Sequence, residues 1–274
     1  MLIDFHTHTF PKAIAEKTLS MLLYNMTHTY NIDQRLNYSG TPDALEDSMI
    51  QTGVDISVTM PIATKPQQFD TINEFAKSTR SEKIIPFGAI HPMSEDIDSK
   101  LSYLYEEGFS GIKLRPDYQG VYADDSEFIS LVRKATDKGM YVMIHSGQDT
   151  GIKPPFRAEV GRIKTLLNKV DEEFVILAHM GGFAEWDAVL KDLAKTRAYF
   201  DTSVVSRFIP MSQYREIIAA HGADRILFGS DQPWESPQDT LKLLKKANLT
   251  PDEEALITYK NAAKILGIPI PKKN

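Results

Sequence analysis

The sequence predicts an α/β protein, a (β/α)8 TIM barrel in which residues 1–274 form a single domain with an insertion after the first strand. Eight short apolar runs recur along the chain, with helical patterns between them. Apart from a wide first gap, the runs start roughly 25–35 residues apart, about the length of one strand–helix unit. The runs are residues 2–5, 56–60, 84–90, 111–114, 140–144, 174–178, 198–201 and 226–228.

The apolar runs are typical of strands buried on both faces, because several are rich in β-branched residues and lack clean alternation. The segments between them carry helix start and stop signals. Thr41-Pro42 is an N-cap followed by proline, and Gly53 supplies the stop. Thr250 and Glu253 form a capping box before the last helix, which is expected to end at Gly267.

An open, doubly wound sheet is the rival fold. That fold requires a glycine-rich phosphate loop after the first strand. Here the first turn reads His-Thr-His-Thr-Phe-Pro. The sequence therefore favours the closed barrel. In the segment after the second strand, Phe69, Ile72 and Phe75 are spaced like the buried face of a helix and are expected in the core.

The composition excludes several classes of protein. The chain has no Cys, which rules out a thiolate zinc site, an iron–sulfur cluster and a cysteine nucleophile. A net charge of −6 argues against a nucleic-acid partner. No apolar run is long enough for a transmembrane helix, and the first residues do not resemble a signal peptide. We expect a cytoplasmic protein with a small-molecule substrate and no membrane partner.

The insertion after the first strand covers residues 10–40, which is too long for an ordinary connection. At this place in a barrel it would sit over the mouth. It is either a surface excursion or a lid that covers the substrate.

Polar residues fall where the predicted strands end, which is where a barrel gathers its chemistry. His6 and His8 end the first strand, and their i, i+2 spacing places both imidazoles on one face. His145, His179 and Asp231 end the fifth, sixth and eighth strands, and Lys113 lies on the fourth. Neutral imidazoles with one carboxylate are a typical site for Zn²⁺ or a similar divalent ion.

The sequence resembles the amidohydrolase superfamily over essentially the whole chain. It is most similar to the amidohydrolase-related branch that includes aminocarboxymuconate-semialdehyde decarboxylase and aromatic-acid decarboxylases. The resemblance rests on Asp4-Phe5-His6-Thr7-His8, Gly111-Ile112-Lys113-Leu114, the two histidine strands, Phe228-Gly229-Ser230-Asp231-Gln232-Pro233-Trp234 and Asn261-Ala262-Ala263-Lys264-Ile265-Leu266-Gly267.

The resemblance implies one divalent metal ion held by His6, His8, His145 and Asp231. Zn²⁺ is the first expectation and Mn²⁺ the alternative. It also implies that His179 acts as the acid/base or orients the water, with Asp231 accepting the water's proton. Lys113 lies where binuclear relatives carry a carboxylated lysine that bridges two metals. The alternative for Lys113 is a lysine that binds a substrate carboxylate or a neighbouring acid.

The expected function is a metal-dependent hydrolase that uses a metal-activated water on an amide, lactone or ester of a small carboxylated molecule. A metal-dependent decarboxylase of an aromatic or unsaturated acid shares the ligand set and is the alternative. A phosphoesterase or TatD-like nuclease, and a non-catalytic metal-binding protein, fit less well. Arg115 and Arg207 are candidates for gripping the substrate carboxylate, or are exposed surface residues. The family habit also suggests a homodimer.

His91 and Trp234 lie near the predicted site but are expected to be structural. His91 follows the third strand, and Trp234 follows Asp231. We interpret the first as a hydrogen-bonded histidine and the second as a packing residue.

Overall fold

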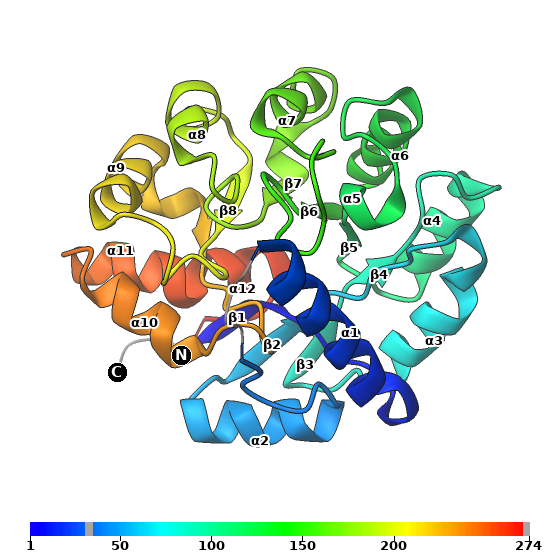
Figure 1. Cartoon of the computed structure of the whole chain (residues 1–274), viewed down its shortest axis with the longest axis horizontal. Helices are drawn as coiled ribbons and strands as arrows, with labels where there is room; N and C mark the ends of the chain where they lie inside the picture. The colour runs from blue at the N-terminus through cyan, green and yellow to red at the C-terminus, as the bar shows by residue number, and fades with distance from the viewer. Residues whose placement is uncertain (31–34, 271–274) are drawn as a thin grey trace.

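Parallel strands surrounded by helices form the framework of the molecule (Figure 1). This computed structural model describes residues 1–30 and 35–270. The strands are β1 (Ile3–Thr7), β2 (Ile56–Thr59), β3 (Ile84–Pro86), β4 (Gly88–Ala89), β5 (Gly111–Leu114), β6 (Tyr141–Ile144), β7 (Val175–Leu177), β8 (Tyr199–Asp201) and β9 (Ile226–Leu227). Their order and parallel pairing confirm the predicted barrel architecture.

The strands form two arcs, β1-β2-β3 and β4 through β9, in chain order. Single backbone hydrogen bonds, and not a continuous ladder, connect β1 with the segment that follows β9. Phe5 N–H donates to the Phe228 carbonyl at 2.8 Å, and Asp231 N–H donates to the His6 carbonyl at 2.7 Å. These bonds bring the ends of the first and last strands together.

The third predicted strand, residues 84–90, is divided at Phe87 into β3 and β4. Pro86 offers no N–H to a neighbouring strand. At Ala89 the side chain of Asn73 takes the place of a strand partner. Its amide donates to the Ala89 carbonyl and its carbonyl accepts from the Ala89 N–H, both at 2.8 Å. A single run of apolar residues therefore contributes one strand to each of the two arcs.

The helices surround the strands, and several begin and end at the predicted signals. Thr41 caps the helix that follows it, and Gly53 ends that helix with a left-handed backbone, φ 76°. Thr250 and Glu253 form the expected capping box. The helices are α1 (Lys12–Tyr30), α2 (Pro42–Thr52), α3 (Phe69–Ser78), α4 (Ile97–Glu106), α5 (Pro116–Gln119), α6 (Ser126–Asp137), α7 (Val160–Leu167), α8 (Trp186–Asp192), α9 (Met211–His221), α10 (Pro237–Lys245), α11 (Pro251–Ala255) and α12 (Asn261–Leu266).

Successive residues of β6 pack into different apolar clusters, as the alternation of a buried strand requires. Val142 and Ile144 belong to the large cluster that includes the buried faces of the surrounding helices. Met143 belongs to a second cluster with residues of other strands, among them Val58 and Ile176. Both faces of the strand are therefore buried, which explains why its sequence lacks alternation.

Helix α1 occupies most of the insertion and crosses in front of the strands in Figure 1. Leu19 and Met26 are buried, and they pack in one cluster with Trp234. The insertion therefore covers the barrel mouth. Residues 31–34 and the side chain of Tyr30, which belong to the same predicted insertion, lie outside the described residues. In the described part of the chain, no helix combines the length and the apolar character needed to span a membrane.

Candidate metal centre

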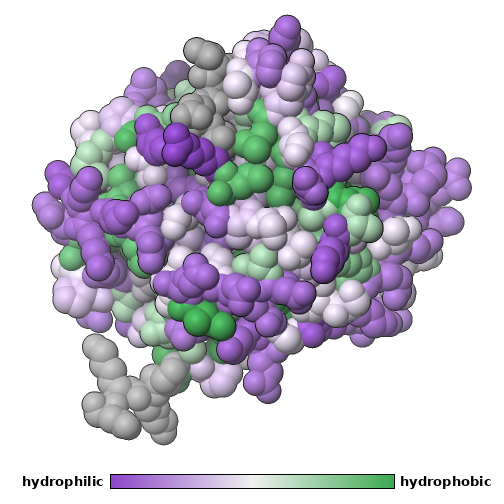
Figure 2. Space-filling model, turned by 60° about the horizontal axis from the view of Figure 1, so that its bottom comes forward, coloured by the Kyte–Doolittle hydropathy of each residue, from purple (hydrophilic) through white to green (hydrophobic). Residues whose placement is uncertain are grey.

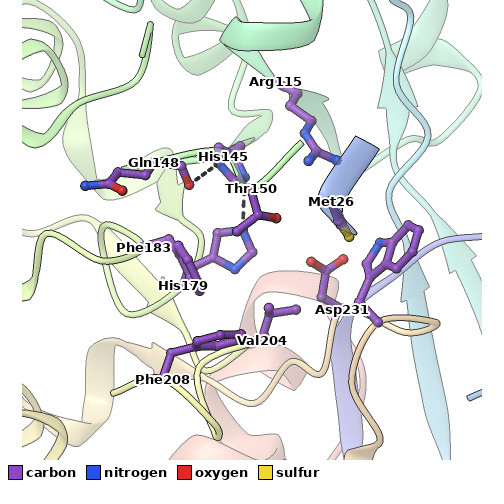
Figure 3. A pocket seen from close by; sticks show the side chains of 11 residues that line it. Met26, Arg115, His145, Gln148, Thr150, His179, Phe183, Val204, Phe208 and Asp231 are labelled. Carbon is purple, nitrogen blue, oxygen red and sulfur yellow. Dashed lines mark hydrogen bonds between the residues drawn. The ribbon is translucent and has the colours of Figure 1, made fainter. Parts of the chain in front are cut away.

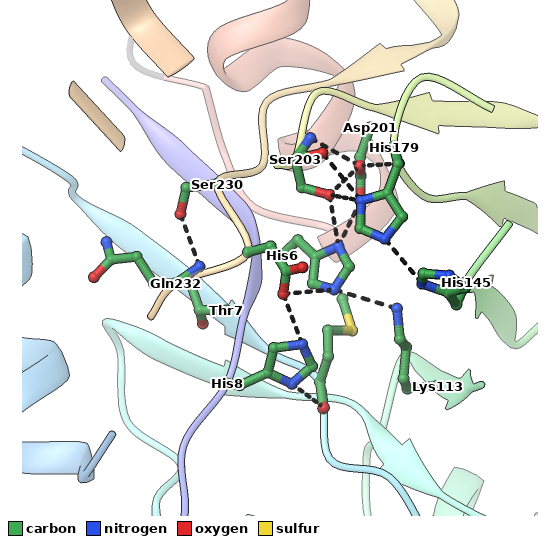
Figure 4. A network of polar contacts seen from close by, with 12 residues as sticks. His6, Thr7, His8, Lys113, His145, His179, Asp201, Ser203, Ser230 and Gln232 are labelled. Atoms are coloured by element: carbon green, nitrogen blue, oxygen red, sulfur yellow. Dashed lines mark hydrogen bonds and ion pairs between the residues drawn. The ribbon is translucent and has the colours of Figure 1, made fainter. Parts of the chain in front are cut away.

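His6, His8 and Asp231 meet at the carboxyl ends of the first and last strands. One nitrogen or oxygen atom from each lies within 4.8 Å of the others. Asp231 Oδ1 is 2.9 Å from His8 Nε2 and 3.5 Å from His6 Nε2. All three side chains are buried. These three strand-end positions therefore converge, and Figure 4 shows the rings of His6 and His8 close together.

Each imidazole of this cluster is oriented by a hydrogen bond at its other nitrogen. His8 Nδ1 donates to the Met60 carbonyl at 2.8 Å, and His6 Nδ1 donates to Asp201 Oδ2 at 2.7 Å. These partners place the ring protons on Nδ1 and leave the Nε2 lone pairs facing Asp231. Outer partners of this kind fix the tautomer of metal-binding histidines.

The three converging atoms fit a divalent cation. Asp231 Oδ1 is buried and accepts no hydrogen bond among the described residues. His8 Nε2, 2.9 Å away, also carries a lone pair, so two acceptors meet there, whereas His6 Nε2 faces the Lys113 amine at 3.2 Å. Burying such groups together is unfavourable unless a cation or a proton lies between them. Nitrogen and oxygen donors in this number suit Zn²⁺ or a similar ion.

Asp201 organises the centre from beneath, although the sequence analysis did not select it. Its Oδ2 accepts from His6, and its Oδ1 accepts from the backbone N–H groups of His179 and Ser203 at 2.8 and 3.0 Å. The Ser203 hydroxyl donates to the same Oδ1 at 2.6 Å. Asp201 ends a predicted strand, so the rule that found His145 would have found it too. Its role as a partner of His6 depends on packing that the sequence does not display.

His145 and His179 form a second pair of histidines beside the cluster. His179 Nε2 lies 3.0 Å from His145 Nδ1, and His179 Nδ1 lies 3.0 Å from the Ser203 carbonyl. The ring of His179 stacks on that of His6, with centroids 5.6 Å apart. His145 is thus close to His179 and is not part of the three-residue cluster. Its predicted role as a metal ligand stays a prediction.

The backbone is left-handed at both predicted catalytic residues, with φ 62° at His179 and φ 62° at Asp231. Non-glycine residues adopt this conformation at an energetic cost, and such residues concentrate at functional sites. The surrounding hydrogen bonds hold them in place. The His179 N–H donates to Asp201, and the Asp231 N–H donates to the His6 carbonyl.

Gly147 brings the loops after β6 and β7 together. Its φ is 85°, and a Cβ at this position would lie 2.3 Å from the Phe183 nitrogen. Instead, Gly147 N–H donates to the Ala158 carbonyl, and Phe183 N–H donates to the Ser146 carbonyl. The close approach places His145 against His179.

Burial and neighbouring charges set the protonation of the centre. Burial, together with the adjacent Lys113, lowers the pKa of His6 to about 4. Burial also holds the pKa of His145 well below its usual range and lowers that of His179. Burial alone would raise the pKa of Asp231, but His6 and His8 hold it well below its usual range. Neutral imidazoles and an ionised carboxylate are the forms that bind metals.

Lys113 is fully buried, and its Nζ lies 3.2 Å from His6 Nε2. Burial lowers the pKa of Lys113 to about 8, although Asp231 and Asp201 oppose the shift. Its amine therefore borders the metal-ligand candidates directly. This position agrees with either predicted role, a bridging carbamate or a cation for a carboxylate.

Arg115 reaches the cavity, whereas Arg207 does not. Nε and Nη2 of Arg115 donate to the two oxygens of Asp149 at 2.7 and 2.9 Å, and its guanidinium stacks on Tyr118. The side chain of Arg207 is exposed, with its guanidinium 5.3 Å from the Phe208 ring centroid. Asp149, which no strand-end pattern predicts, also lies 3.7 Å from His145 Nε2.

The two remaining residues near the site pack as expected. His91 is buried, its Nε2 bonds to the Gln119 carbonyl at 3.0 Å, and its Nδ1 accepts from Met93 N–H. Trp234 packs against Leu19 and Met26 of α1. Trp234 also lines the cavity, which packing alone did not predict.

A cavity opens beside the metal-ligand candidates. Its walls include His145, His179, Asp231, Arg115 and Met26. Figure 3 shows Asp231 facing His179 across the cavity, with Arg115 above them. Phe183 and Phe208 supply an apolar side. The cavity therefore brings together His179, which can carry a proton, the cation of Arg115 and an apolar wall.

Comparison with known proteins identifies relatives of this chain. A model of the Amidohydrolase family matches residues 3–268. Among curated protein sequences there is no significant match.

Solved structures with the same fold include proteins of different activity. A probable 2-pyrone-4,6-dicarboxylic acid hydrolase from Acinetobacter baumannii, solved with citric acid bound, is 16% identical over 97% of this chain and 99% of its own, with a TM-score of 0.65. An amidohydrolase from Burkholderia multivorans with bound zinc is 17% identical over 98% of this chain and 100% of its own, TM-score 0.69. The 5-carboxyvanillate decarboxylase of Sphingomonas paucimobilis is 14% identical over 98% and 99%, TM-score 0.64.

Proposed function

Because this chain belongs to the Amidohydrolase family, we propose that it is a metal-dependent hydrolase that cleaves an amide, lactone or ester of a small carboxylated molecule. The observation that carries the proposal is the convergence of His6, His8 and Asp231, whose buried acceptor atoms lie within 4.8 Å of one another. We propose that His6, His8, His145 and Asp231 hold one divalent ion, with Zn²⁺ as the first expectation and Mn²⁺ as the alternative.

A divalent ion bound there supplies Lewis-acid chemistry, which polarises a carbonyl and lowers the pKa of water toward neutrality. The protein's own part is proton movement. Asp231 is ionised, and its carboxylate is the group placed to accept a proton. His179 is neutral, and its Nδ1 faces the Ser203 carbonyl. Its Nε2 lies 3.0 Å from His145 Nδ1 at the cavity wall, and we propose that this nitrogen exchanges a proton with the leaving group.

Arg115 is the residue best placed to hold a substrate carboxylate. Its pairing with Asp149 fixes the guanidinium plane at the cavity wall. A planar donor of this kind suits a carboxylate. Lys113 lies deeper, against His6, and is a second cation for the same group. Arg207 is outside the lining of this cavity, so we give its predicted contact with substrate less weight.

A metal-dependent decarboxylase is the second candidate, since solved structures of this fold include decarboxylases. In that reaction the same residues would bind the substrate's oxygen groups and deliver a proton to the carbon that loses CO₂. The ligand set is common to both reactions, so the products must separate them.

The test is a small panel of lactones, acyl amides and carboxylated phenols given to protein reconstituted with Zn²⁺ or Mn²⁺. Acid release is followed by pH-stat titration and CO₂ release by a coupled assay. We expect acid release without CO₂. CO₂ release alone would establish the decarboxylase instead, and turnover of none of these substrates would contradict both.

Two variants separate the roles of the histidine pair. His145→Ala should lose tight metal binding and activity together. His179→Ala should lose turnover and keep much of the metal, because His179 is proposed as a proton carrier. Metal content is measured on the purified variants without chelator. Equal metal loss in both variants would make His179 a ligand.

A further inference from the structure

A second, larger cavity lies beneath α1, beside the metal-ligand candidates. Its volume is about 480 Å³, within the range of small-molecule sites. Residues of α1, among them Ile14 and Leu22, line one side. Ile72 and Phe75 of α3 line the other. Those two residues were predicted as core with Phe69, but of the three only Phe69 is buried. Both side chains line this cavity instead.

The two cavities share a wall. Arg115 and Trp234 line both of them. His8 lines the larger cavity, while Asp231, which is 2.9 Å from His8, lines the smaller. The metal-ligand candidates therefore lie between the two cavities. A molecule whose carbonyl is held at this cluster has its remaining atoms next to the larger cavity.

The charges around the larger cavity indicate what it holds. Apart from His8, Arg115 is the one ionisable cation among its described lining residues, and no Asp or Glu is present there. Arg115, whose charge is shared with Asp149, is the cation assigned to a first carboxylate. The remaining polar groups are neutral hydroxyls and amides, such as Thr18 and Gln68. A second carboxylate placed deep in this cavity would lack a cation, which disfavours a small dicarboxylate.

The outer edge of the cavity is apolar as well. Ile14 and Met21 on α1 are 48% and 56% exposed, and both line it. Apolar side chains reach the surface in the upper half of the face shown in Figure 2. Exposed apolar residues at the edge of a cavity are typical of a ligand-binding site.

We propose that the substrate carries an uncharged, predominantly apolar group, larger than a methyl group, that occupies the cavity between α1 and α3. The reacting carbonyl lies at the His6–His8–Asp231 cluster, and a carboxylate, where the substrate has one, lies at Arg115. This proposal rests on the proposed function for the position of the reacting group. It adds the chemistry of the rest of the substrate.

The first measurement is binding and does not depend on turnover. Straight-chain carboxylates from acetate to octanoate are titrated into the full-length metal-reconstituted protein by calorimetry. Burial of apolar surface predicts that affinity rises about twofold to fourfold for each added methylene. An affinity that stays flat from acetate to octanoate overturns the proposal.

A matched pair of variants places that binding in the cavity. Ile72→Trp fills the cavity from α3, and Ile50→Trp makes the same change on α2, where Ile50 is 75% exposed and outside both cavities. We expect Ile72→Trp to lower octanoate affinity at least about tenfold. The Ile50→Trp protein should bind as wild type. Equal binding by the two variants overturns the proposal.

Phe75→Ala is the second cavity variant, in case Ile72→Trp does not fold. It removes a ring from the lining, so octanoate affinity should fall several-fold while acetate affinity changes little. Unchanged octanoate affinity in this variant overturns the proposal in the same way.

Turnover separates this proposal from the proposed function. A series of γ-lactones with side chains from methyl to hexyl is assayed by acid release. A kcat/KM that rises with chain length, and loses the rise in Ile72→Trp, supports both proposals. A kcat/KM that does not depend on side-chain length overturns only the proposal that the cavity binds an apolar group. Chain-length-dependent binding without any hydrolysis supports the cavity and contradicts the hydrolase.

Discussion

The metal-ligand cluster and the cavity beneath α1 share a wall, yet the chain builds them in opposite ways. The cluster consists of polar groups at strand ends, held by Asp201, Ser203 and backbone carbonyls. The cavity is lined mostly by apolar side chains, several of them on α1 and α3. The barrel therefore fixes where the chemistry occurs. We infer that the insertion and α3 determine which molecules reach it.

Removing a ligand of the cluster is the first and largest way to test this division of roles. Asp231→Asn takes away the carboxylate that lies between His6 and His8. We expect kcat/KM to fall by about 10²–10⁴-fold or more, because proton transfer and metal binding are lost together. Octanoate binding in the cavity should weaken far less. Steady-state kinetics and calorimetry measure the two.

Asp239→Asn is the control for this change, since Asp239 is exposed on α10 and pairs with Lys242 at the surface. It should keep wild-type kinetics. Full activity in Asp231→Asn would remove Asp231 from the catalytic account.

Asp201→Asn tests the hydrogen bond between Asp201 and His6 that supports the cluster. The neutral amide weakens the hydrogen bond that orients His6, without touching the proposed ligands. Outer partners of this kind contribute about 10–100-fold to metal affinity. We expect the Kd for Zn²⁺ to rise by that factor, measured by competition with a chromogenic chelator. Ser203→Ala, which removes one donor to Asp201, should have a smaller effect. An unchanged Kd in Asp201→Asn would mean that His6 needs no such support.

The attachment of α1 is tested by Leu19→Ala. Leu19 is 1% exposed and packs with Met26 and Trp234 over the mouth. Truncation of a buried leucine costs about 2–5 kcal/mol of unfolding free energy. We expect a fall in Tm of roughly 5–10 °C by calorimetry. Met21→Ala on the same helix removes an exposed side chain and should shift Tm by far less. Equal shifts would show that α1 is not anchored through Leu19.

Acid should weaken the cluster before it affects the apolar cavity. The pKa of His6 is lowered to about 4 from an ordinary value near 6.5. Between these pH values His6 is protonated in the unfolded chain and neutral in the native protein. The contribution of His6 to the free energy of unfolding is therefore complete above pH 6.5 and is lost as the pH falls toward 4. In metal-free protein, the Tm advantage of wild type over His6→Gln should shrink by roughly 3–6 °C between pH 7 and 4.5.

The control for this titration is Ile50→Gln, because Ile50 is 75% exposed on α2, carries no titratable group and lies outside the cluster. Its Tm difference from wild type should not change with pH. A constant difference for His6→Gln as well would mean that His6 keeps an ordinary pKa in the folded protein.

The sequence predicted the barrel and the residues of the cluster for one physical reason. Parallel strands end at the same edge, so polar residues at several strand ends must meet there. This reasoning selects His6, His8 and Asp231 without knowledge of the packing, but it selects His145 equally, and His145 lies outside the three-residue cluster. The same rule applies to Asp201, because Asp201 lies at the end of another strand.

The cavity was not predicted, because it depends on how two helices lean on the barrel. Ile72 and Phe75 follow the spacing of a buried face, but only tertiary packing decides whether that face meets the core or a hollow. In the same way, the pairing of Arg115 with Asp149 joins two loops, and no spacing along the chain encodes it. Division of the third strand by Asn73 is a further feature set by side-chain packing.

The central claim is that this chain binds a divalent ion at the strand-end cluster. Metal analysis of protein purified without chelator tests it most directly. We predict about one divalent ion per chain, and the loss of this ion in Asp231→Asn. A folded protein that carries no metal, and gains none when Zn²⁺ or Mn²⁺ is added, would contradict it.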